Sequence, residues 1–143
     1  MKTIVVLVVG IVLISVLFCP MAMAGRPTVI PSDIQILQPD PSLPKELSAF
    51  FGKWEGKTWG ADYFLIVEKI DQEKVSFSIW RDGRVEDIVP LGWQRYESEV
   101  IKERGKYKLW WRGPLGNYEL ALKGEYLEMD YLPRWSIRFI RVP

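Results

Sequence analysis

From residue 53 onward, apolar and polar residues alternate along the chain with the period of two that is typical of half-buried β-strands. In residues 74–80, for example, Val75, Phe77 and Ile79 fall on one face of the expected strand. This alternation, or a continuous apolar run, predicts strands over residues 53–59, 63–70, 74–80, 85–89, 93–102, 106–112, 117–123, 126–131 and 135–142. Short strands at this spacing indicate an all-β sandwich or barrel.

The connections between these segments are short, which favours an antiparallel up-and-down meander over crossover connections. Asp82-Gly83 matches the residues preferred in a type I′ hairpin turn, and residues 113–116 (Gly-Pro-Leu-Gly) form a second clear loop. A meander has two unpaired edges, and closure into a barrel removes both of them. The sequence therefore predicts an all-β fold, an antiparallel up-and-down barrel of about eight strands.

A short helical turn is expected before the first strand, over residues 44–51. Ser42 is a suitable cap, Pro44 is tolerated in a first turn, and Gly52 suits the residue that ends a helix. The barrel domain, including this turn, is thus expected over residues 45–143.

The residues before this domain have the composition of a targeting segment followed by a linker. Residues 4–18 are almost continuously apolar and Ala24 ends a small-residue cleavage motif, so residues 1–24 are predicted to be a cleaved signal peptide. An uncleaved anchor is the alternative, although the apolar run is shorter than the roughly 20 residues of a typical span. Residues 25–44 hold five prolines and are expected to be an extended linker, in which residues 34–37 could lie against the domain. We therefore expect a periplasmic or secreted protein with no membrane span after cleavage.

The composition excludes several classes of chemistry. The chain has no histidine, and its one cysteine, Cys19, lies in the predicted signal peptide. Zinc, haem and copper sites built on these residues are therefore excluded, as are His- or Cys-dependent catalysts. The formal net charge is +1 and becomes zero without Lys2, which argues against a nucleic-acid partner. We expect no cofactor, no metal and no catalytic residue, and an enzyme is the less favoured class.

Carboxylate pairs are the remaining candidates for acid–base chemistry or calcium binding. Glu97 and Glu99 share one strand face, and Glu128 and Asp130 share another. Because these residues alternate with apolar ones, as on any half-exposed strand, solvated surface charges are the favoured interpretation.

The helical turn, the Gly52-Lys53-Trp54 opening of the first strand and the meander that follows resemble the calycins. This superfamily contains the lipocalins, the fatty-acid-binding proteins and small bacterial secreted lipocalin-like domains. The resemblance implies that Trp54 closes one end of the barrel and that a basic side chain of the last strand packs across it. Arg138 or Arg141 would supply this side chain, and Arg138 is taken as the partner of Gly52 and Trp54. The geometry is reasonable because a guanidinium can stack on an indole and bond nearby carbonyls.

Aromatic side chains are the main indication of function. Trp59, Trp80 and Trp110 lie opposite the main apolar set of their strands or next to a glycine. Tyr118 and Arg112 are further candidate ligand contacts, because an aromatic pocket with one or two polar groups suits a small molecule. The sequence thus predicts a non-enzymatic domain that binds a small amphipathic or aromatic molecule. The alternatives are core packing of these side chains, or a cell-envelope module that binds a glycan or protein through surface tryptophans. The oligomeric state stays open.

Overall fold

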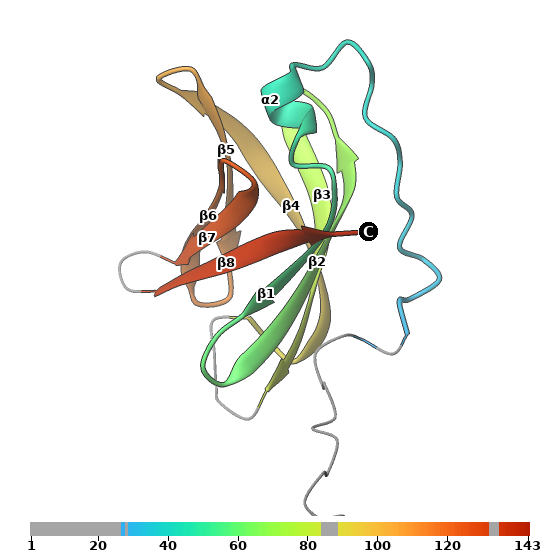
Figure 1. The fold of residues 1–143 in the computed structure, drawn as a ribbon, viewed down its shortest axis with the longest axis vertical. Coiled ribbons are helices and arrows are strands. Elements are labelled where there is room, and N and C mark those ends of the chain that lie inside the picture. Colours follow the sequence, from blue (N-terminus) through green and yellow to red (C-terminus); the bar gives the residue numbers. More distant parts are fainter. Residues whose placement is uncertain (1–26, 28, 84–88, 132–134) are drawn as a thin grey trace, which may run out of the picture.

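The computed structural model describes residue 27 and residues 29–83, 89–131 and 135–143, and within them one short helix precedes eight strands (Figure 1). The elements are α2 (Lys45–Ser48), β1 (Gly52–Lys57), β2 (Ala61–Ile70), β3 (Lys74–Gly83), β4 (Gly92–Glu103), β5 (Lys106–Gly113), β6 (Gly116–Lys123), β7 (Tyr126–Tyr131) and β8 (Trp135–Val142). The strands form a closed barrel in sequence order, with every neighbouring pair antiparallel. The predicted all-β up-and-down barrel is confirmed.

The barrel closes where β1 pairs with β8. In this pair Lys53 lies opposite Val142 and Gly56 lies opposite Phe139. Gly56 suits this position because a Cβ there would meet the Phe139 ring at 2.8 Å. Closure pairs the first strand with the last, so neither remains an open sheet edge.

The pairing between β4 and β5 covers only part of their length. Residues 99–103 of β4 pair with residues 106–110 of β5, whereas residues 92–98 pair only with β3 among the described strands. Along this stretch the wall is bridged by side chains, among them Tyr96 and Trp111, whose ring centroids are 6.0 Å apart.

The core is formed by the inward rows of the strands together with residues in and after α2. Val75, Phe77 and Ile79, which the alternation placed on one face, are all fully buried. Leu47 and Phe50 cover one end of the same cluster. Full burial of such side chains contributes about 1.5–3 kcal/mol each, so this cluster supplies much of the stability of a chain without disulfides.

One local prediction at the end of β3 differs from the structure, and a second is not tested by the described residues. β3 continues through Asp82 and Gly83, which lie opposite Asp62 and Ala61 of β2, so the predicted two-residue hairpin is wrong. Pairing with a long neighbouring strand overrides the local turn preference. The strand predicted over residues 85–89 falls almost entirely outside the described residues.

α2 is a single turn, as expected, but its start differs from the prediction. Pro44 is the N-cap and no side chain bonds the free N–H groups of the turn. Ser42 does not cap the helix, since its own N–H donates to Asp40 Oδ1 at 2.8 Å.

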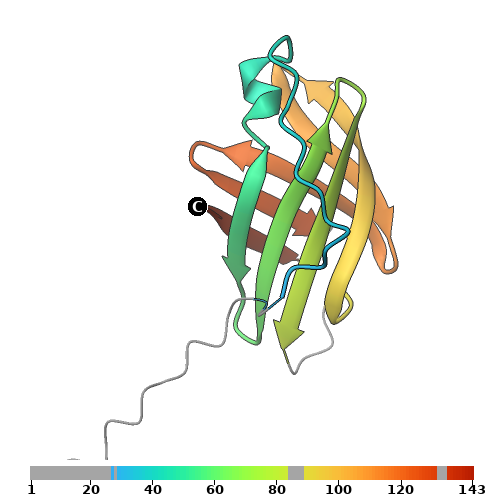
Figure 2. The same ribbon diagram turned by 90° about the vertical axis from the view of Figure 1, so that its right-hand side faces the viewer.

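Residues 29–43, here called the strap, run along the outer surface of β2, β3 and β4 (Figure 2). The N–H of Leu37 donates to the carbonyl of Glu68 at 2.7 Å. Arg95 lies between the strap and the wall, with Nη1 3.3 Å from Asp33 Oδ2 and Nε 3.1 Å from Glu68 Oε1. Part of the expected linker therefore packs on the outside of the barrel.

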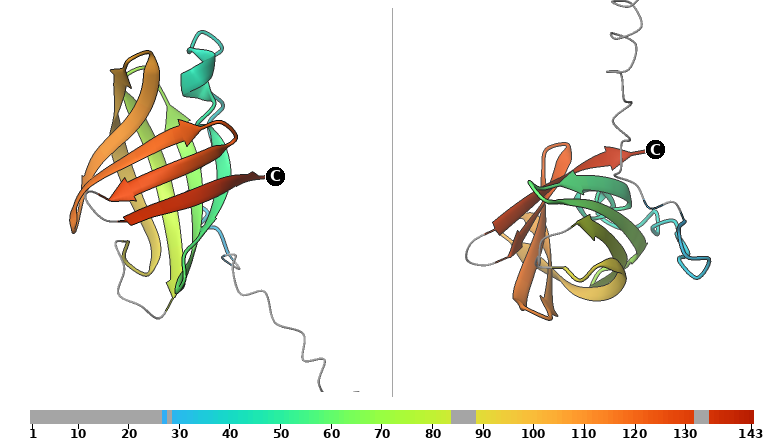
Figure 3. Two further views of the ribbon diagram at one scale, coloured as in Figure 1. Left: turned by 60° about the vertical axis from the view of Figure 1, so that its left-hand side comes forward. Right: turned by 90° about the horizontal axis from the view of Figure 1, so that it is seen from below.

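Consecutive strands run in opposite directions, so the connections alternate between the two ends of the barrel. The helix end carries α2 and the connections β2–β3, β4–β5 and β6–β7. The loop end carries the connections β1–β2, β3–β4, β5–β6 and β7–β8. The β1–β2 and β5–β6 connections lie away from α2 in both Figure 1 and the left view of Figure 3.

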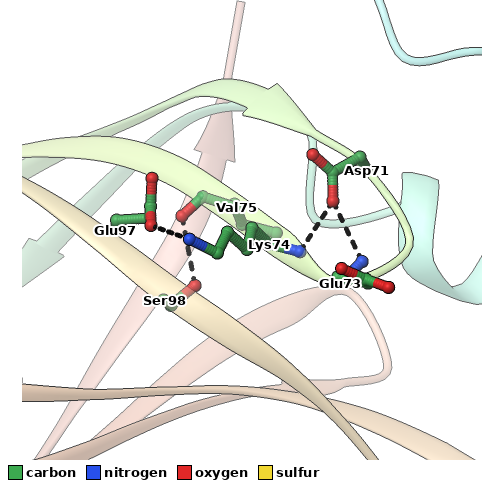
Figure 4. Close-up of polar contacts among 6 residues, drawn as sticks. All are labelled: Asp71, Glu73, Lys74, Val75, Glu97 and Ser98. Atoms are coloured by element: carbon green, nitrogen blue, oxygen red, sulfur yellow. Dashed lines mark hydrogen bonds and ion pairs between the residues drawn. The ribbon is translucent and has the colours of Figure 1, made fainter.

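The β2–β3 turn shows how the helix end is built from polar groups. Asp71 Oδ1 accepts the N–H groups of Glu73 at 2.9 Å and Lys74 at 2.7 Å (Figure 4). These two backbone hydrogen bonds hold the pKa of Asp71 below its ordinary value, because they favour the ionised carboxylate. Lys74 Nζ in turn lies 2.6 Å from Glu97 Oε1 on β4.

Candidate functional site

Five aromatic side chains from five successive strands form a continuous group inside the barrel, here called the aromatic belt. They are Phe77 of β3, Tyr96 of β4, Trp111 of β5, Tyr118 of β6 and Tyr131 of β7. Neighbouring rings lie 4.8–6.0 Å apart between centroids, and Trp111 stacks on Tyr118 with an interplanar angle of 10°. Ring pairs at such distances attract one another beyond their area burial.

The strand registers explain why these rings meet. Phe77 lies directly opposite Tyr96, and Tyr118 lies opposite both Trp111 and Tyr131. Directly opposite residues point to the same side of a sheet, so each pair enters the interior together. The belt crosses from Tyr96 to Trp111 at the level where β4 and β5 are not paired.

The belt is buried in its middle and partly exposed at two members. Phe77, Trp111 and Tyr118 are buried, whereas Tyr96 and Tyr131 are partly exposed. Burial raises the pKa of the Tyr96 phenol, so the hydroxyl stays protonated and can donate a hydrogen bond at neutral pH. The Tyr131 hydroxyl donates to the carbonyl of Leu115, which ties the belt to the β5–β6 turn.

A buried cation lies in the same half of the barrel. Arg81 points inward near the end of β3 and is only 4% exposed. Its Nη1 donates to the carbonyl of Val89 at 2.5 Å, and it lies opposite Tyr63 of β2. A guanidinium inside an apolar barrel offers an anionic or polar group a charge-assisted hydrogen bond.

The candidate ligand contacts predicted from the sequence do not form one site. Tyr118 belongs to the aromatic belt. Trp59 is 99% exposed in the β1–β2 connection, and Arg112 is exposed near the end of β5. Trp80 and Trp110 are partly exposed and alternate with the buried rows of β3 and β5, so they lie on the outer face of the wall. The structure therefore places four of the five outside the interior.

The helix end carries the arrangement implied by the Gly-x-Trp opening, with one correction. Trp54 is fully buried and its Nε1 donates to the carbonyl of Phe50 at 3.0 Å. The cation over its ring is Arg141, with the guanidinium carbon 4.2 Å from the centroid, and the choice of Arg138 is wrong. Arg138 instead lies 4.2 Å over the ring of Tyr126.

Strand parity explains this correction. Arg141 lies directly opposite Trp54, so the two side chains share a face. Arg138 is three residues away along β8 and therefore points to the other side. Arg141 also donates through Nη1 to the carbonyl of Phe51 at 2.5 Å and through Nη2 to that of Ala49 at 2.6 Å. Burial lowers its pKa from the ordinary value.

Gly52 completes this end of the barrel. It opens β1 with a φ of +124°, and a Cβ would lie 2.8 Å from Arg141 Nη1. A groove of about 640 Å³ lies outside this end, with Tyr126, Ile140 and both arginines in its lining.

The carboxylate pairs lie on outer faces, where they alternate with buried residues. Glu97 pairs with Lys74, and Glu128 lies 3.9 Å from Lys123. Burial, followed by the charge of Glu128, raises the pKa of Asp130. The acidic side chains of the described residues include no group of three or more placed to hold a metal ion.

No protein-family model matches this chain, and no curated protein or solved structure gives a significant match to it. The closed eight-stranded barrel is consistent with a lipocalin-like fold. No helix in the described part of the chain has the length and hydropathy needed to cross a membrane.

Most of the belt was missed because the sequence reasoning looked for tryptophans away from the main apolar rows. Phe77 and Trp111 belong to those rows, beside Ile79 and Leu109. The useful signal was that aromatic residues recur on the inward rows of neighbouring strands. Arg81 gave its own signal, since it continues the Val75-Phe77-Ile79 row with a charge.

Proposed function

We propose that this protein is a lipocalin-like, non-enzymatic domain that binds a small aromatic or amphipathic molecule within the loop-end half of its barrel. The observation that carries the proposal is the aromatic belt, a set of contacting rings of which Tyr96 and Tyr131 are partly exposed. Ligand pockets are typically apolar and aromatic, with a few polar groups that set orientation.

The stretch between β4 and β5 is the proposed entrance. Residues 92–98 pair only with β3 in the described structure, and Tyr96 lies on this stretch. Strands that are not hydrogen-bonded to each other can separate without breaking a ladder. A planar ligand would then stack against Tyr96 and Trp111, the two rings that face each other across the interval.

Arg81 and the Tyr96 hydroxyl are the proposed polar contacts. Arg81 would pair with an anionic group, and the protonated Tyr96 would donate a hydrogen bond. A compound with fused rings and one negative charge satisfies both requirements.

Anilinonaphthalene sulfonate is a suitable probe, because it combines aromatic rings with an anion and fluoresces in an apolar site. We expect saturable fluorescence with the folded protein, and weaker binding by Tyr96→Ala and Arg81→Gln. Trp110→Ala is the matched control, since Trp110 lies on the outer face of the wall. Equal binding by Tyr96→Ala and Trp110→Ala would place the probe elsewhere and contradict the proposal. Far-UV circular dichroism of each variant checks that the barrel persists.

The proposed setting is the periplasm or the extracellular medium, with the signal peptide removed after Ala24. Native mass spectrometry of the protein from its own envelope fraction tests both ideas together. We expect a chain that begins at Gly25 and an added mass that disappears on denaturation. A retained N-terminus would instead support the anchor alternative.

The alternative of an interaction module is supported by Trp59, which is 99% exposed. Trp80 and Trp110 do not join it in one surface, because they lie on the outer faces of two strands separated by β4. A module would therefore use the loop end rather than the three tryptophans together.

A further inference from the structure

Four connections meet at the loop end, and four described residues in or beside them have large exposed apolar side chains. We call these residues the apolar rim: Trp59 (99% exposed), Trp135 (66%), Leu91 (60%) and Leu115 (56%). Trp59, Leu91 and Leu115 lie in the β1–β2, β3–β4 and β5–β6 connections, and Trp135 is the first residue of β8. Single exposed apolar residues are common, but one in or beside every connection of the same end indicates an interaction surface.

The helix end provides the internal control. Its turns are Asp71-Gln72-Glu73, Arg104-Gly105 and Gly124-Glu125, and none of these residues is a large apolar one. The same barrel therefore has polar tips at one end and apolar tips at the other.

The β1–β2 connection, which carries Trp59, is held in place by two polar contacts. The β1–β2 connection is closed by a hydrogen bond from the Thr58 N–H to the Ala61 carbonyl at 2.9 Å, and Lys57 pairs with Asp62 at 3.2 Å. This brace presents Trp59 at the tip.

Both rim leucines occur in the same tripeptide, Pro-Leu-Gly, at residues 90–92 and 114–116. The glycine that follows each leucine has a positive φ, +79° at Gly92 and +143° at Gly116. Each glycine has a backbone conformation that a Cβ would strain, and the next strand begins at that glycine. The leucine before it therefore stays outside the strand.

The described chain also begins at this end. Trp93, the second residue of β4, donates through Nε1 to the carbonyl of Val29 at 3.2 Å. Between Val29 and the apolar residues 4–18 there are ten residues, 19–28, which can span at most about 35 Å. In the anchor alternative, in which residues 1–24 are retained, this length would keep the rim close to the membrane.

We propose that the apolar rim docks on the surface of a lipid bilayer. Separate apolar tips on separate loops suit a fluid surface, which needs no matching shape, and tryptophan is favoured at membrane–water interfaces. The chain is formally neutral without Lys2, so apolar insertion rather than attraction to anionic lipid supplies the binding. The inference is independent of the proposed small-molecule site, because no belt residue belongs to the rim.

The test uses the mature chain that begins at Gly25, mixed with phosphatidylcholine vesicles. One variant carries Trp59→Cys and the matched control carries Lys106→Cys, an exposed residue at the helix end, each labelled with a nitrobenzoxadiazole fluorophore. We expect blue-shifted emission and quenching by spin-labelled lipid at position 59, and neither at position 106. The same emission at both positions would overturn the proposal.

A second variant shows whether the rim itself is responsible. The label is placed at Asn117, an exposed residue two positions after Leu115, with the rim intact or with all four rim residues changed to serine. We expect the lipid-dependent signal at Asn117→Cys to disappear in the four-serine rim. Persistence of the signal would overturn lipid docking by the rim. A signal that instead grows with protein-to-lipid ratio would assign the rim to self-association, and that outcome too would reject the proposal.

Discussion

The two ends of this barrel differ in which tryptophan and arginine side chains are buried. At the helix end, Trp54 is fully buried under Arg141, whose guanidinium bonds two backbone carbonyls. At the loop end, Trp59 is almost completely exposed, and a buried cation, Arg81, lies inside the wall. The same residue types, tryptophan and arginine, therefore serve opposite purposes at the two ends.

The difference separates stability from function. The helix end satisfies many of its polar groups internally, and a groove of about 640 Å³ lined by Tyr126 and Ile140 lies beside it. The loop end leaves apolar tips uncovered, Tyr96 partly exposed and residues 92–98 paired on one side only in the described structure. Connections on a rigid scaffold commonly carry function, and both proposals place it at the loop end. The predictions that follow test whether stability depends on the helix end.

The largest difference is expected between the two tryptophans. Trp54→Ala removes a fully buried indole and should lower the free energy of unfolding by about 3–5 kcal/mol. Trp59→Ala removes an exposed one and should change it by less than about 0.5 kcal/mol. Urea denaturation followed by circular dichroism measures both. Comparable losses for the two variants would refute the division between the ends.

Arginines of β8 give the second comparison. Arg141→Met keeps an apolar stem over Trp54 but leaves the carbonyls of Phe51 and Ala49 without these donors. Because hydrogen bonds to charged groups contribute about 1.5–3 kcal/mol, we expect a loss in that range. Arg138→Met removes a stacked cation from Tyr126 and should cost less than about 1 kcal/mol. If Arg138→Met proved the more damaging change, the assignment of Arg141 to the closed end would be wrong.

Alanine substitutions at two glycines, one at each end of the barrel, compare how tightly the two ends are packed. A Cβ at Gly113 would collide with the ring of Tyr118, which is stacked on Trp111 and cannot move easily. Gly113→Ala should therefore destabilise the fold by about 1–3 kcal/mol through overpacking. Gly124, in the β6–β7 turn, has a φ of +67° and open space around it, so alanine there should cost about 1 kcal/mol through backbone strain alone.

A double-mutant cycle separates these two causes. In a Tyr118→Leu background, the cost of Gly113→Ala should shrink because the ring edge is gone, while the cost of Gly124→Ala should stay the same. An unchanged cost for Gly113→Ala would mean that contact with the Tyr118 ring does not limit this position.

The sequence was sufficient for the strands because alternation reports burial directly. The bounds of β7 and β8 match those expected, and the other predicted bounds of described strands differ by a few residues at most. The failure at Asp82-Gly83 arose because a turn preference is local, whereas continued pairing with β2 depends on a segment about twenty residues away.

The site was harder because it depends on which face points inward and which connections share an end. Tyr118 was chosen from an inward row and does lie in the belt, whereas Trp80 and Trp110 were chosen from outward rows. The choice of Arg138 was wrong for the same reason, because it is three residues from Arg141 and therefore points to the opposite face of β8. The two Pro-Leu-Gly tripeptides of the rim are visible in the sequence. That their leucines lie at the same end of the barrel follows only from the alternation of connections in a closed meander.

The smallest expected effect concerns the polar turns of the helix end. Asp71 accepts two backbone N–H groups, which lowers its pKa below the ordinary value of 3.8. A lowered pKa in the folded state stabilises the fold above the ordinary value, and this contribution is lost as the pH falls through the folded-state pKa. Asp71→Asn keeps an acceptor oxygen but does not titrate, so its stability should fall less steeply between about pH 4 and pH 2.

Because Asp71 is largely exposed, the charge contribution should stay below about 1 kcal/mol. Asp71→Ala provides the contrast, since it removes the acceptor as well and should lower stability at every pH. Urea denaturation of the three proteins across this pH range checks the prediction. Parallel pH profiles for the parent and Asp71→Asn would show that the carboxylate charge of this turn does not contribute to stability.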